Sequence, residues 1–465
     1  MPLIWCAISG HGYGHAAQVV PVLNALGELV PGLTAVLRTT VPSSFFRDRL
    51  TIQWELSPAQ QDIGCIQDGP LKIDIDATWA AHQRFHETWE ARLSNEVAAM
   101  QAASSALIIA DTPYLALEAG SRAQIPTIAL ASFTWDLVLK EYCHASDNSH
   151  QRLIQCIRGS YAKADMALRI TPAPNIDAFS SIIDIGPIAN PASPERDRLA
   201  SALALAPNER TVLVGFGGIP LTSLPLDQIE QLHHYHFLFD GPVPPGYSRM
   251  HSTKTLPFSF KTLLASVDVI MTKPGYGTIV EAVALQQPVV YVRRYNFADE
   301  PPLVDYLHRY GRGVELSIDD FTKGRWEPAL LQALTAPLPL LPPPPPTGTA
   351  EAAAVIAQQL RNFFRQQLRP AHQFGMVEQS ADAIPVHVME LAHGSRRALA
   401  NAPVRVHRRQ SLRRGLGERI NRETGIPEDR RARRIGIASH EAYHHGLAQV
   451  AMLLISANNR MSHVA

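Results

Sequence analysis

The chain has 465 residues, of which 46% are hydrophobic and 18% charged, and its formal net charge is zero. This length and hydrophobic content are enough for two domains with full cores. The four cysteines are scattered without C-x-x-C spacing, which argues against a disulfide framework or a cysteine zinc site and favours a reducing compartment. No apolar run approaches the roughly 20 residues that a membrane span needs, and the N-terminal PLIWCAI is too short for a signal peptide. We therefore expect a soluble, cytoplasmic protein.

Charge is unevenly distributed along the chain. Residues 371–465 contain 14 Arg, no Lys and 8 acidic residues, which gives +6, whereas residues 1–370 carry 28 basic and 34 acidic residues, which gives −6. Such a tail could make weak contact with an anionic surface, as in a peripheral membrane protein, but its composition favours a solvated or disordered extension. We predict no specific nucleic-acid partner. The tail also contains an H-E-x-x-H match at His440, Glu441 and His444, which we interpret as a chance match, so no metal site is predicted.

The predicted elements alternate between short apolar strands and helix-length segments. The strands expected in the first half are 3–9, 33–40, 106–112, 126–132 and 166–171, and those in the second half are 211–218, 233–241, 267–277 and 288–294. A helix is expected over 85–103, between two of the strands. Strands that alternate with helices predict parallel βαβ units.

The alternation pauses once, in a segment rich in Pro, Asn and Ser. We therefore predict an N-terminal Rossmann-like domain over 1–170, a linker over 171–208 and a C-terminal Rossmann-like domain over 209–340. A proline run precedes an amphipathic closing helix over 349–368, and the basic tail follows. The predicted fold class is α/β, with two parallel sheets that face a central cleft.

Three glycine-rich turns follow predicted strands, at 10–15, 215–218 and 272–284. Open parallel sheets bind ligands beyond the carboxyl ends of their strands, where such turns lie. Glycine lets the backbone approach a ligand closely, and a helix N-terminus favours a phosphate group. Neither G-x-G-x-x-G nor G-x-x-x-x-G-K-[ST] is present, which disfavours a dehydrogenase or a P-loop NTPase. A nucleotide diphosphate is the natural candidate ligand.

The residues of these turns resemble a known family. The stretch TKPGYGTIVEAVALQQPVVYVRR, followed by FADEPPLVDYL, resembles the nucleotide-sugar-binding motif of GT-B glycosyltransferases. SGHGYGHA, SFTWDLVLKEY, KPGYGTIVEA and VRRYNFADEPPLVDYL, in this order across residues 1–325, are similar to the glycosyltransferase-like region of L-arabinokinases and their free-standing bacterial relatives. No phosphate loop of the sugar-kinase class is seen after residue 370, so kinase activity is not carried over.

The resemblance implies a donor site in the C-terminal half. The donor-binding residues that we predict are Gly217, Gly218, Lys273, Gly275, Tyr276, Gly277, Thr278, Glu281, Asp299 and Glu300. By resemblance, the third turn holds the diphosphate, Glu281 binds the ribose, and Asp299 and Glu300 bind hydroxyls of the sugar.

Each of these assignments has a purely structural alternative. Thr278 and Glu281 form a T-x-x-E pattern that could simply cap a helix, and the second turn could be a tight connection. The two acidic residues 299 and 300 could lie in a solvated loop.

Catalysis of sugar transfer needs a base for the acceptor hydroxyl, and histidine suits this role. The resemblance places His15 at a helix N-terminus that faces the cleft, with His11 as the second candidate. A helix N-terminus lowers the pKa of histidine, so we expect a neutral ring at His15. The alternative is that both imidazoles only hold the loop by hydrogen bonds. Asp111 could orient the base or cap the helix that follows it, and we expect capping.

The segment SFTWDLVLKEY supplies the candidate acceptor wall. Phe133, Trp135 and Asp136 follow a predicted strand at the same edge as the opening loop. Aromatic rings stack on sugars and a carboxylate binds hydroxyls, although the two aromatic residues could instead be ordinary core packing.

The sequence therefore predicts a glycosyltransferase that uses a nucleotide diphosphate-sugar, expected to be UDP-linked, and a sugar or other hydroxyl acceptor. We expect no required cofactor, because helix amides and Lys273 can take the diphosphate charge. The alternatives are a non-catalytic sugar-nucleotide-binding module and a sugar-nucleotide epimerase on the same fold.

Overall fold

The computed structural model describes residues 2–69, 71–216 and 224–367. These residues belong to one compact unit. The predicted basic tail, its H-E-x-x-H match and the glycines Gly217 and Gly218 lie outside the described residues. None of the helices in the described ranges is both long and apolar enough to cross a membrane.

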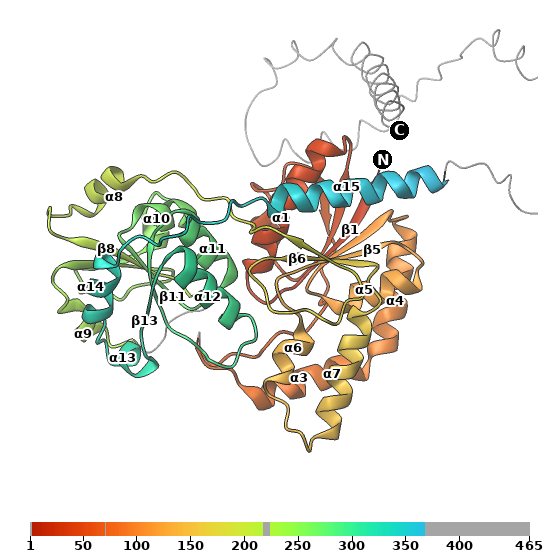
Figure 1. The fold of residues 1–465 in the computed structure, drawn as a ribbon, viewed down its shortest axis with the longest axis horizontal. Helices are drawn as coiled ribbons and strands as arrows, with labels where there is room; N and C mark the ends of the chain where they lie inside the picture. The colour runs from red at the N-terminus through yellow and green to blue at the C-terminus, as the bar shows by residue number, and fades with distance from the viewer. Residues whose placement is uncertain (1, 70, 217–223, 368–465) are drawn as a thin grey trace, which may run out of the picture. The chain divides into compact units, whose positions relative to one another are not determined.

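The first half is built on a seven-stranded parallel sheet with the order β3-β2-β1-β4-β5-β6-β7. Its strands are β1 (Leu3–Ile8), β2 (Thr34–Arg38), β3 (Gln53–Leu56), β4 (Leu107–Asp111), β5 (Thr127–Ala131), β6 (Met166–Ile170) and β7 (Ile182–Ile185). Its helices are α1 (Gly14–Leu29), α2 (Ser43–Phe46), α3 (Ile75–Glu87), α4 (Trp89–Ala102), α5 (Tyr114–Arg122), α6 (Trp135–Lys140) and α7 (Asn148–Tyr161). Helices lie on both faces of the sheet (Figure 1).

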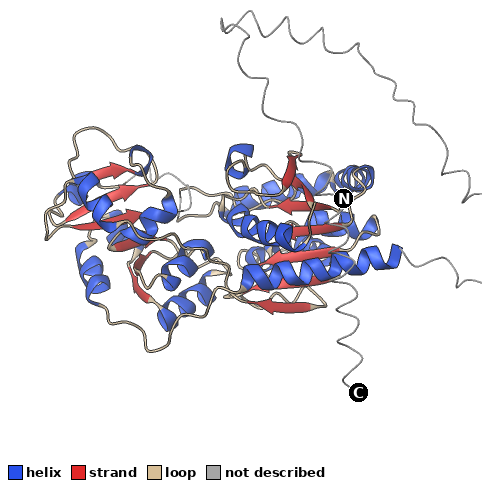
Figure 2. Cartoon of the chain, turned by 90° about the horizontal axis from the view of Figure 1, so that it is seen from above, coloured by secondary structure: helices blue, strands red, loops and turns tan. Residues whose placement is uncertain are grey.

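The second half repeats this plan with a six-stranded parallel sheet of order β10-β9-β8-β11-β12-β13. Its strands are β8 (Arg210–Val214), β9 (Tyr235–Phe239), β10 (Met250–Ser252), β11 (Val269–Thr272), β12 (Pro288–Tyr291) and β13 (Arg312–Glu315). Its helices are α8 (Arg196–Leu203), α9 (Leu226–Glu230), η1 (Thr253–Thr255), α10 (Phe260–Ser266), α11 (Tyr276–Ala284), α12 (Glu300–Tyr310), α13 (Ile318–Thr322) and α14 (Glu327–Thr335). Both sheets are therefore Rossmann-like, as predicted, and Figure 2 shows their strands between layers of helices.

The central strands bury both faces, which explains their nearly continuous apolar sequences. In β1, Ile4, Cys6 and Ile8 belong to one hydrophobic cluster and Trp5 and Ala7 to another, because successive side chains point to opposite faces of the sheet. The helix α15 (Gly348–Gln367) lies where the amphipathic closing helix was predicted and packs against α1 of the first half.

The structure differs from the sequence prediction mainly at the edges of the sheets. The four strands that were not predicted, β3, β7, β10 and β13, are the edge strands of the two sheets. An edge strand has one neighbour and a partly exposed face, so it lacks the apolar run that marks a buried strand. Two of the differences fall in the predicted linker, which contains β7 and α8. The segment 85–103, predicted as one helix, is divided between α3 and α4, which meet at Thr88.

A buried histidine on α3 makes the fold sensitive to acid. His82 is completely buried, and this burial, followed by the charge of His86, lowers the pKa of His82 to about 3. Below its ordinary pKa of 6.5 the unfolded chain takes up the proton and the folded chain does not, so stability is lost as pH falls. We expect His82 to cost about 2 kcal/mol of unfolding free energy between pH 6.5 and pH 5.

Urea denaturation of His82→Leu across this pH range measures the effect. The variant should lose less stability on acidification than the wild type, whereas the control His144→Leu, at an exposed position, should behave as the wild type. Equal pH slopes for the wild type and His82→Leu would contradict the prediction.

Candidate active site

The opening glycine turn joins β1 to α1 and brings His15 next to the end of β4. The order of the first sheet reverses between β1 and β4, and ligands of Rossmann-like folds bind where such loops diverge. His15 lies in the first turn of α1, and its Nδ1 is 3.0 Å from Oδ1 of Asp111, the last residue of β4. An Nδ1–H that donates to Asp111 leaves Nε2 as the free lone pair. No described residue hydrogen-bonds to Nε2.

Asp111 does not cap the following helix, which corrects the sequence prediction. The residue that precedes α5 is Pro113, and no side chain caps this helix. Asp111 instead pairs with His15 across 96 residues of sequence. Periodicity cannot reveal this pairing because it depends on the adjacency of β1 and β4.

A strained residue fixes this His–Asp pair. Thr112 has a φ of 71°, which is unfavourable for a β-branched side chain and costs about 1–3 kcal/mol. Its carbonyl accepts a hydrogen bond of 2.7 Å from the Tyr161 hydroxyl, and its own hydroxyl donates to Asp111 Oδ1 at 3.1 Å. The same hydroxyl is 3.3 Å from His15 Nδ1. These contacts hold the strained turn and, with it, the orientation of the imidazole.

The pKa of His15 is raised, in contrast to the lowering expected from the helix N-terminus. Burial by itself lowers the pKa of His15, but the carboxylates of Asp111, Asp62 and Asp299 together raise it above its usual 6.5. Three nearby carboxylates outweigh the partial charge of one helix end. His15 is therefore a stronger base than an isolated imidazole.

His11 has the opposite electrostatic environment. Burial, followed by the positive charges of His15, Lys273 and Arg294, lowers the pKa of His11 to about 3. The ring is therefore neutral near neutral pH, and its Nε2 lies 3.1 Å from the Gln67 side-chain amide nitrogen, within hydrogen-bond distance. His11 is thus a poor general base.

The candidate acceptor wall is more buried than a binding surface would be. Trp135 is completely buried; its indole donates to Asp62 Oδ2 at 2.8 Å, and its ring meets the His11 ring edge-on. Phe133 is 5% exposed and lies 5.6 Å from the His15 ring. The two aromatic residues support the histidines from behind, which fits the packing alternative. Asp136 is also buried, and Arg158 donates to it at 3.3 Å.

In the second half, the third glycine turn lies at the equivalent reversal, between β8 and β11. α11 begins at Tyr276 with Gly275 before it and no side-chain cap. The backbone amides of residues 276–278 donate to no described residue, and a Cβ built on Gly277 would meet no described atom within 4 Å. The helix start is therefore open, and its amides and dipole favour an anion. At the second turn, Gly215 follows β8 and packs beside Phe260.

Lys273 lies between β11 and this helix. It makes no salt bridge with a described residue, and burial, followed by the charge of Arg294, lowers its pKa to about 8. Asp299 and Glu300 oppose this lowering. At neutral pH Lys273 therefore carries a positive charge without a fixed partner.

Three residues predicted at the donor site have other contacts. Thr278 does not cap α11, because the helix begins two residues earlier, so the capping-box alternative is wrong. Glu281 is 9% exposed and its Oε1 is 2.7 Å from Lys261 Nζ, while Oε2 has no hydrogen bond among the described residues. Tyr276 is tied to the linker: its hydroxyl donates to the Thr171 carbonyl at 2.8 Å and accepts from the Ile188 amide at 3.1 Å. It is therefore not free to bind a donor.

The acidic pair before α12 divides into two environments. Glu300 is completely buried; it accepts from Arg294 Nε at 2.7 Å and from the amides of Arg294 and Tyr295. It shapes the turn and cannot reach a sugar, which corrects its assignment. Asp299 is 8% exposed, its Oδ1 has no hydrogen bond among the described residues, and burial raises its pKa to about 7. The same Oδ1 lies 3.9 Å from Nη2 of Arg294, within an ion-pair distance. Of the two carboxylates, Asp299 is therefore the better candidate for a ligand contact.

The two halves contribute to the same region. Phe297, from the turn before α12, belongs to the hydrophobic cluster of the first sheet and lies 5.8 Å from the Phe133 ring. The charge of Asp299 acts on His15, and that of Lys273 acts on His11. Groups beyond the carboxyl ends of both sheets are therefore close to one another.

Comparison with known proteins agrees with this architecture. The sequence matches no protein family model. It is 26% identical over 336 residues to L-arabinokinase of Arabidopsis thaliana, which covers 70% of this chain and 32% of that protein, so the chain spans about a third of that relative's length. Its fold is similar to the crystal structure of the glycotransferase of kitacinnamycin, with a TM-score of 0.50 and 16% identity over 78% of this chain and 96% of the other. TcCGT1 in complex with UDP also has a TM-score of 0.50, with 13% identity over 78% and 99% of the two chains.

The chain has a GT-B fold. The predicted fold class is thereby confirmed, and so is the resemblance of the sequence to L-arabinokinase. At these identities the structural likeness establishes the fold alone, and the chemistry has to come from the residues described above.

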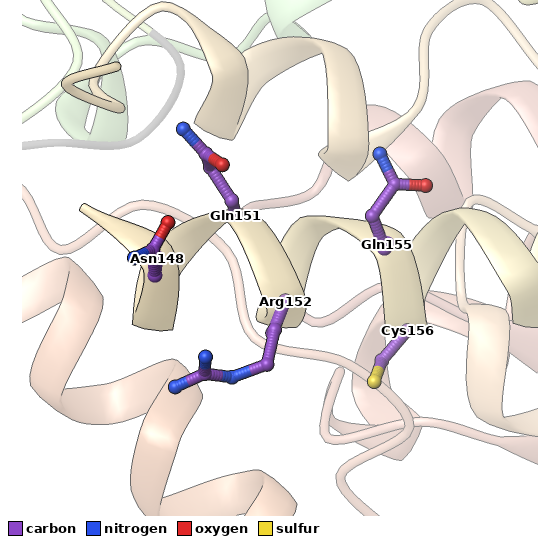
Figure 3. Close-up of a pocket in the computed structure, with 5 residues that line it drawn as sticks. All are labelled: Asn148, Gln151, Arg152, Gln155 and Cys156. Carbon is purple, nitrogen blue, oxygen red and sulfur yellow. The ribbon is translucent and has the colours of Figure 1, made fainter. Parts of the chain in front are cut away.

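A cavity of this GT-B chain is formed by residues of α7, none of which belongs to the candidate active site. It has a volume of about 540 Å³ and is lined by Asn148, Gln151, Arg152, Gln155 and Cys156, all on α7. The five side chains leave the helix in different directions and do not converge on one point (Figure 3). Polar side chains of one helix that do not converge make a poor binding site, so we assign no ligand to it.

Sequence reasoning missed three polar residues that the fold brings to the region. Asp62 lies in the long loop between β3 and α3, Thr112 holds the His–Asp pair, and Arg294 lies over the Phe297 ring at 3.9 Å. The loop has no periodicity and no turn motif, so no local signal marks Asp62. Thr112 and Arg294 are the last residues of the predicted strands 106–112 and 288–294, and their position at the carboxyl ends of central strands could have identified them.

Proposed function

We propose that this chain is a glycosyltransferase that moves a sugar from a nucleotide diphosphate-sugar to a hydroxyl acceptor. The observation that carries the proposal is the oriented His15–Asp111 pair near an uncapped helix start and an unpaired lysine. A base and an anion site are the two parts that a transfer of this kind needs.

The donor diphosphate would bind at the start of α11. Its open amides and Lys273 can take the negative charge without a metal or another cofactor. TcCGT1, a structure with the same fold, was solved in complex with UDP, and this supports a UDP-linked donor. Glu281 would bind the ribose through Oε2, and Asp299 a hydroxyl of the sugar.

The chemical step would begin with the acceptor hydroxyl at Nε2 of His15. As its oxygen forms a bond to the anomeric carbon, the hydroxyl proton passes to Nε2, and Asp111 stabilises the resulting imidazolium. The bond from the anomeric carbon to the diphosphate oxygen breaks, and its electron pair leaves with the diphosphate. The α11 amides and Lys273 would stabilise this departing charge.

The direct test is release of UDP from UDP-glucose, UDP-galactose and UDP-L-arabinose in the presence of a panel of hydroxyl acceptors. Acceptor-dependent UDP release from one of the donors is the expected result. L-Arabinose is included among the acceptors because the relative's name refers to this sugar. Tight UDP binding without release would favour the alternative, a sugar-nucleotide-binding module.

Affinity for the diphosphate should depend on pH through Lys273. In the protein without ligand, Lys273 has a pKa of about 8. UDP affinity should therefore be flat near neutral pH and fall as the pH rises through 8, by up to about tenfold per pH unit. Calorimetric titration of UDP between about pH 7 and pH 9.5 measures this dependence.

The Lys273→Met variant isolates the contribution of this side chain. It should bind UDP about 10- to 100-fold more weakly near pH 7, as expected for loss of a hydrogen bond to a charged group, and without the alkaline fall. Lys163→Met, at an exposed position, is the control. An alkaline fall that persists in Lys273→Met would assign the pH dependence to another group.

A further inference from the structure

A small polar pocket lies beside the two histidines, under the loop between β3 and α3. Its volume is about 140 Å³, and its lining includes Gly10, His11, Thr40, Gln61, Asp62 and Gly64. Two of these residues belong to the opening glycine turn, and Asp62 bonds to Trp135 behind His11. The pocket therefore adjoins the candidate catalytic centre but is too small for a nucleotide-sugar.

The side-chain amide of Gln61, which lines this pocket, makes no hydrogen bond with a described residue. Its side chain is 2% exposed, and neither its amide oxygen nor its amide nitrogen has a hydrogen-bond partner. A buried polar group left unpaired costs about 1–3 kcal/mol, so such groups in native proteins call for a partner. An amide offers one acceptor and two donors, which suits a ligand hydroxyl that can both donate and accept.

The walls of the pocket are fixed by two glycines. A Cβ on Gly10 would lie 2.0 Å from Thr40 Oγ1, and a Cβ on Gly64 would lie 2.2 Å from His11 Nδ1. Glycine at these positions lets the threonine hydroxyl and the imidazole pack directly against the backbone. The positions of these polar groups are therefore set before a ligand arrives.

The charge of the lining selects against anions. The residues that line the pocket include a carboxyl group, Asp62, but neither lysine nor arginine. A phosphate or carboxylate ligand would meet this carboxyl group with no lysine or arginine in the lining to pair with it. A neutral ring with several hydroxyls can donate to Asp62 and exchange hydrogen bonds with the Gln61 amide.

We propose that this pocket binds a neutral polyhydroxyl ring, the sugar acceptor of the reaction, with Gln61 and Asp62 as its polar contacts. The assignment of the ring as acceptor rests on the proposed function. Binding of the ring itself rests on the unpaired amide, the fixed walls and the charge of the lining. Gln61 is then a residue that binds the acceptor, and the carboxyl group of Asp62 disfavours phosphorylated acceptors.

The test is binding of D-glucose, D-galactose, D-xylose and L-arabinose to the full chain, measured by saturation-transfer NMR, with D-glucose 6-phosphate as the anionic comparison. At least one neutral sugar should bind, and the phosphorylated sugar should not. In Gln61→Leu that sugar should bind about 3- to 10-fold more weakly, as expected for loss of a neutral hydrogen bond.

Stability distinguishes a binding role from a structural one. Without ligand, Gln61→Leu should melt at the same temperature as the wild type or higher, because it removes an unpaired buried amide. Gln83→Leu, at an exposed position on α3, is the matched control and should change neither property. If Gln61→Leu does not fold, Gln61→Asn serves instead. Its shorter side chain withdraws the amide from the pocket, so it should weaken sugar binding in the same way.

UDP binding, measured in parallel, separates this inference from the proposed function. If UDP stabilises the wild type and Gln61→Leu alike but no neutral sugar binds, the pocket proposal is overturned and the donor site stands. Equal binding of D-glucose 6-phosphate, or unchanged sugar affinity in Gln61→Leu, overturns it as well. If a neutral sugar binds through Gln61 and UDP does not bind, the pocket stands and the transferase proposal fails.

Discussion

Replacement of His15 by alanine is expected to reduce sugar transfer by about 10²- to 10⁴-fold while leaving UDP affinity unchanged. The expectation follows from the geometry, because Asp111 holds Nδ1 at 3.0 Å and no described residue bonds to Nε2. A base that acts only in the transition state affects kcat and not binding of the donor. Turnover should be measured as UDP release under saturating donor, with UDP affinity determined separately by calorimetry.

Asp111→Asn tests the orientation of the ring without removing it. An amide can donate to Nδ1 and thereby favour the wrong tautomer, and the loss in a comparable His–Asp pair is about 10⁴-fold. His144→Ala, at an exposed position of the same half, should retain full activity. If His15→Ala kept more than about a tenth of wild-type turnover, general-base catalysis by His15 would be refuted.

The same pair sets the pH profile. Because nearby carboxylates, Asp111 foremost, raise the pKa of His15 above 6.5, kcat/KM should rise with pH through a midpoint above that value. Asp111→Asn removes this charge, so the midpoint of the rise in kcat/KM should move to lower pH in the activity that the variant retains. An unchanged midpoint in Asp111→Asn would assign the titration to a group other than His15.

The second large effect expected is stabilisation of the protein by UDP. A ligand at 100 times its dissociation constant adds about 2.7 kcal/mol to the free energy of unfolding, and thermal denaturation detects a change of this size. Glu281→Ala should abolish most of the stabilisation if Glu281 binds the ribose, because the nucleotide would lose a charge-assisted hydrogen bond. Glu327→Ala, at an exposed position of the same half, should respond to UDP as the wild type does.

The contact of Glu281 with Lys261 at 2.7 Å provides a second comparison. If Glu281 acts on the nucleotide directly, Lys261→Met should retain the response to UDP. If the carboxylate only holds α10 against α11, both variants should lose the response equally. Absence of any shift with UDP in the wild type would remove the basis for a donor site at α11.

The sequence alone determined the class of fold, and it pointed to the edges of the sheets where a ligand is expected. The central strands β1, β4, β8 and β11 are buried on both faces, so they must be continuous apolar runs and are readable from residue order. The glycine turns that follow such strands place His15 and Lys273 at the carboxyl edges of the two sheets, while the roles that the family resemblance implies for them stay predictions. The edge strands could not be predicted, because a partly exposed face removes the continuous apolar run that marks a buried strand.

Only the tertiary structure decided which polar groups meet. The pairing of Asp111 with His15, the burial of Glu300 under Arg294 and the unpaired amide of Gln61 depend on contacts between segments or within irregular loops. Such contacts are set by strand order and packing and leave no periodic trace in the sequence. The direction of the His15 pKa shift depended on them too, since three carboxylates from separate segments converge on a ring whose own helix would lower it.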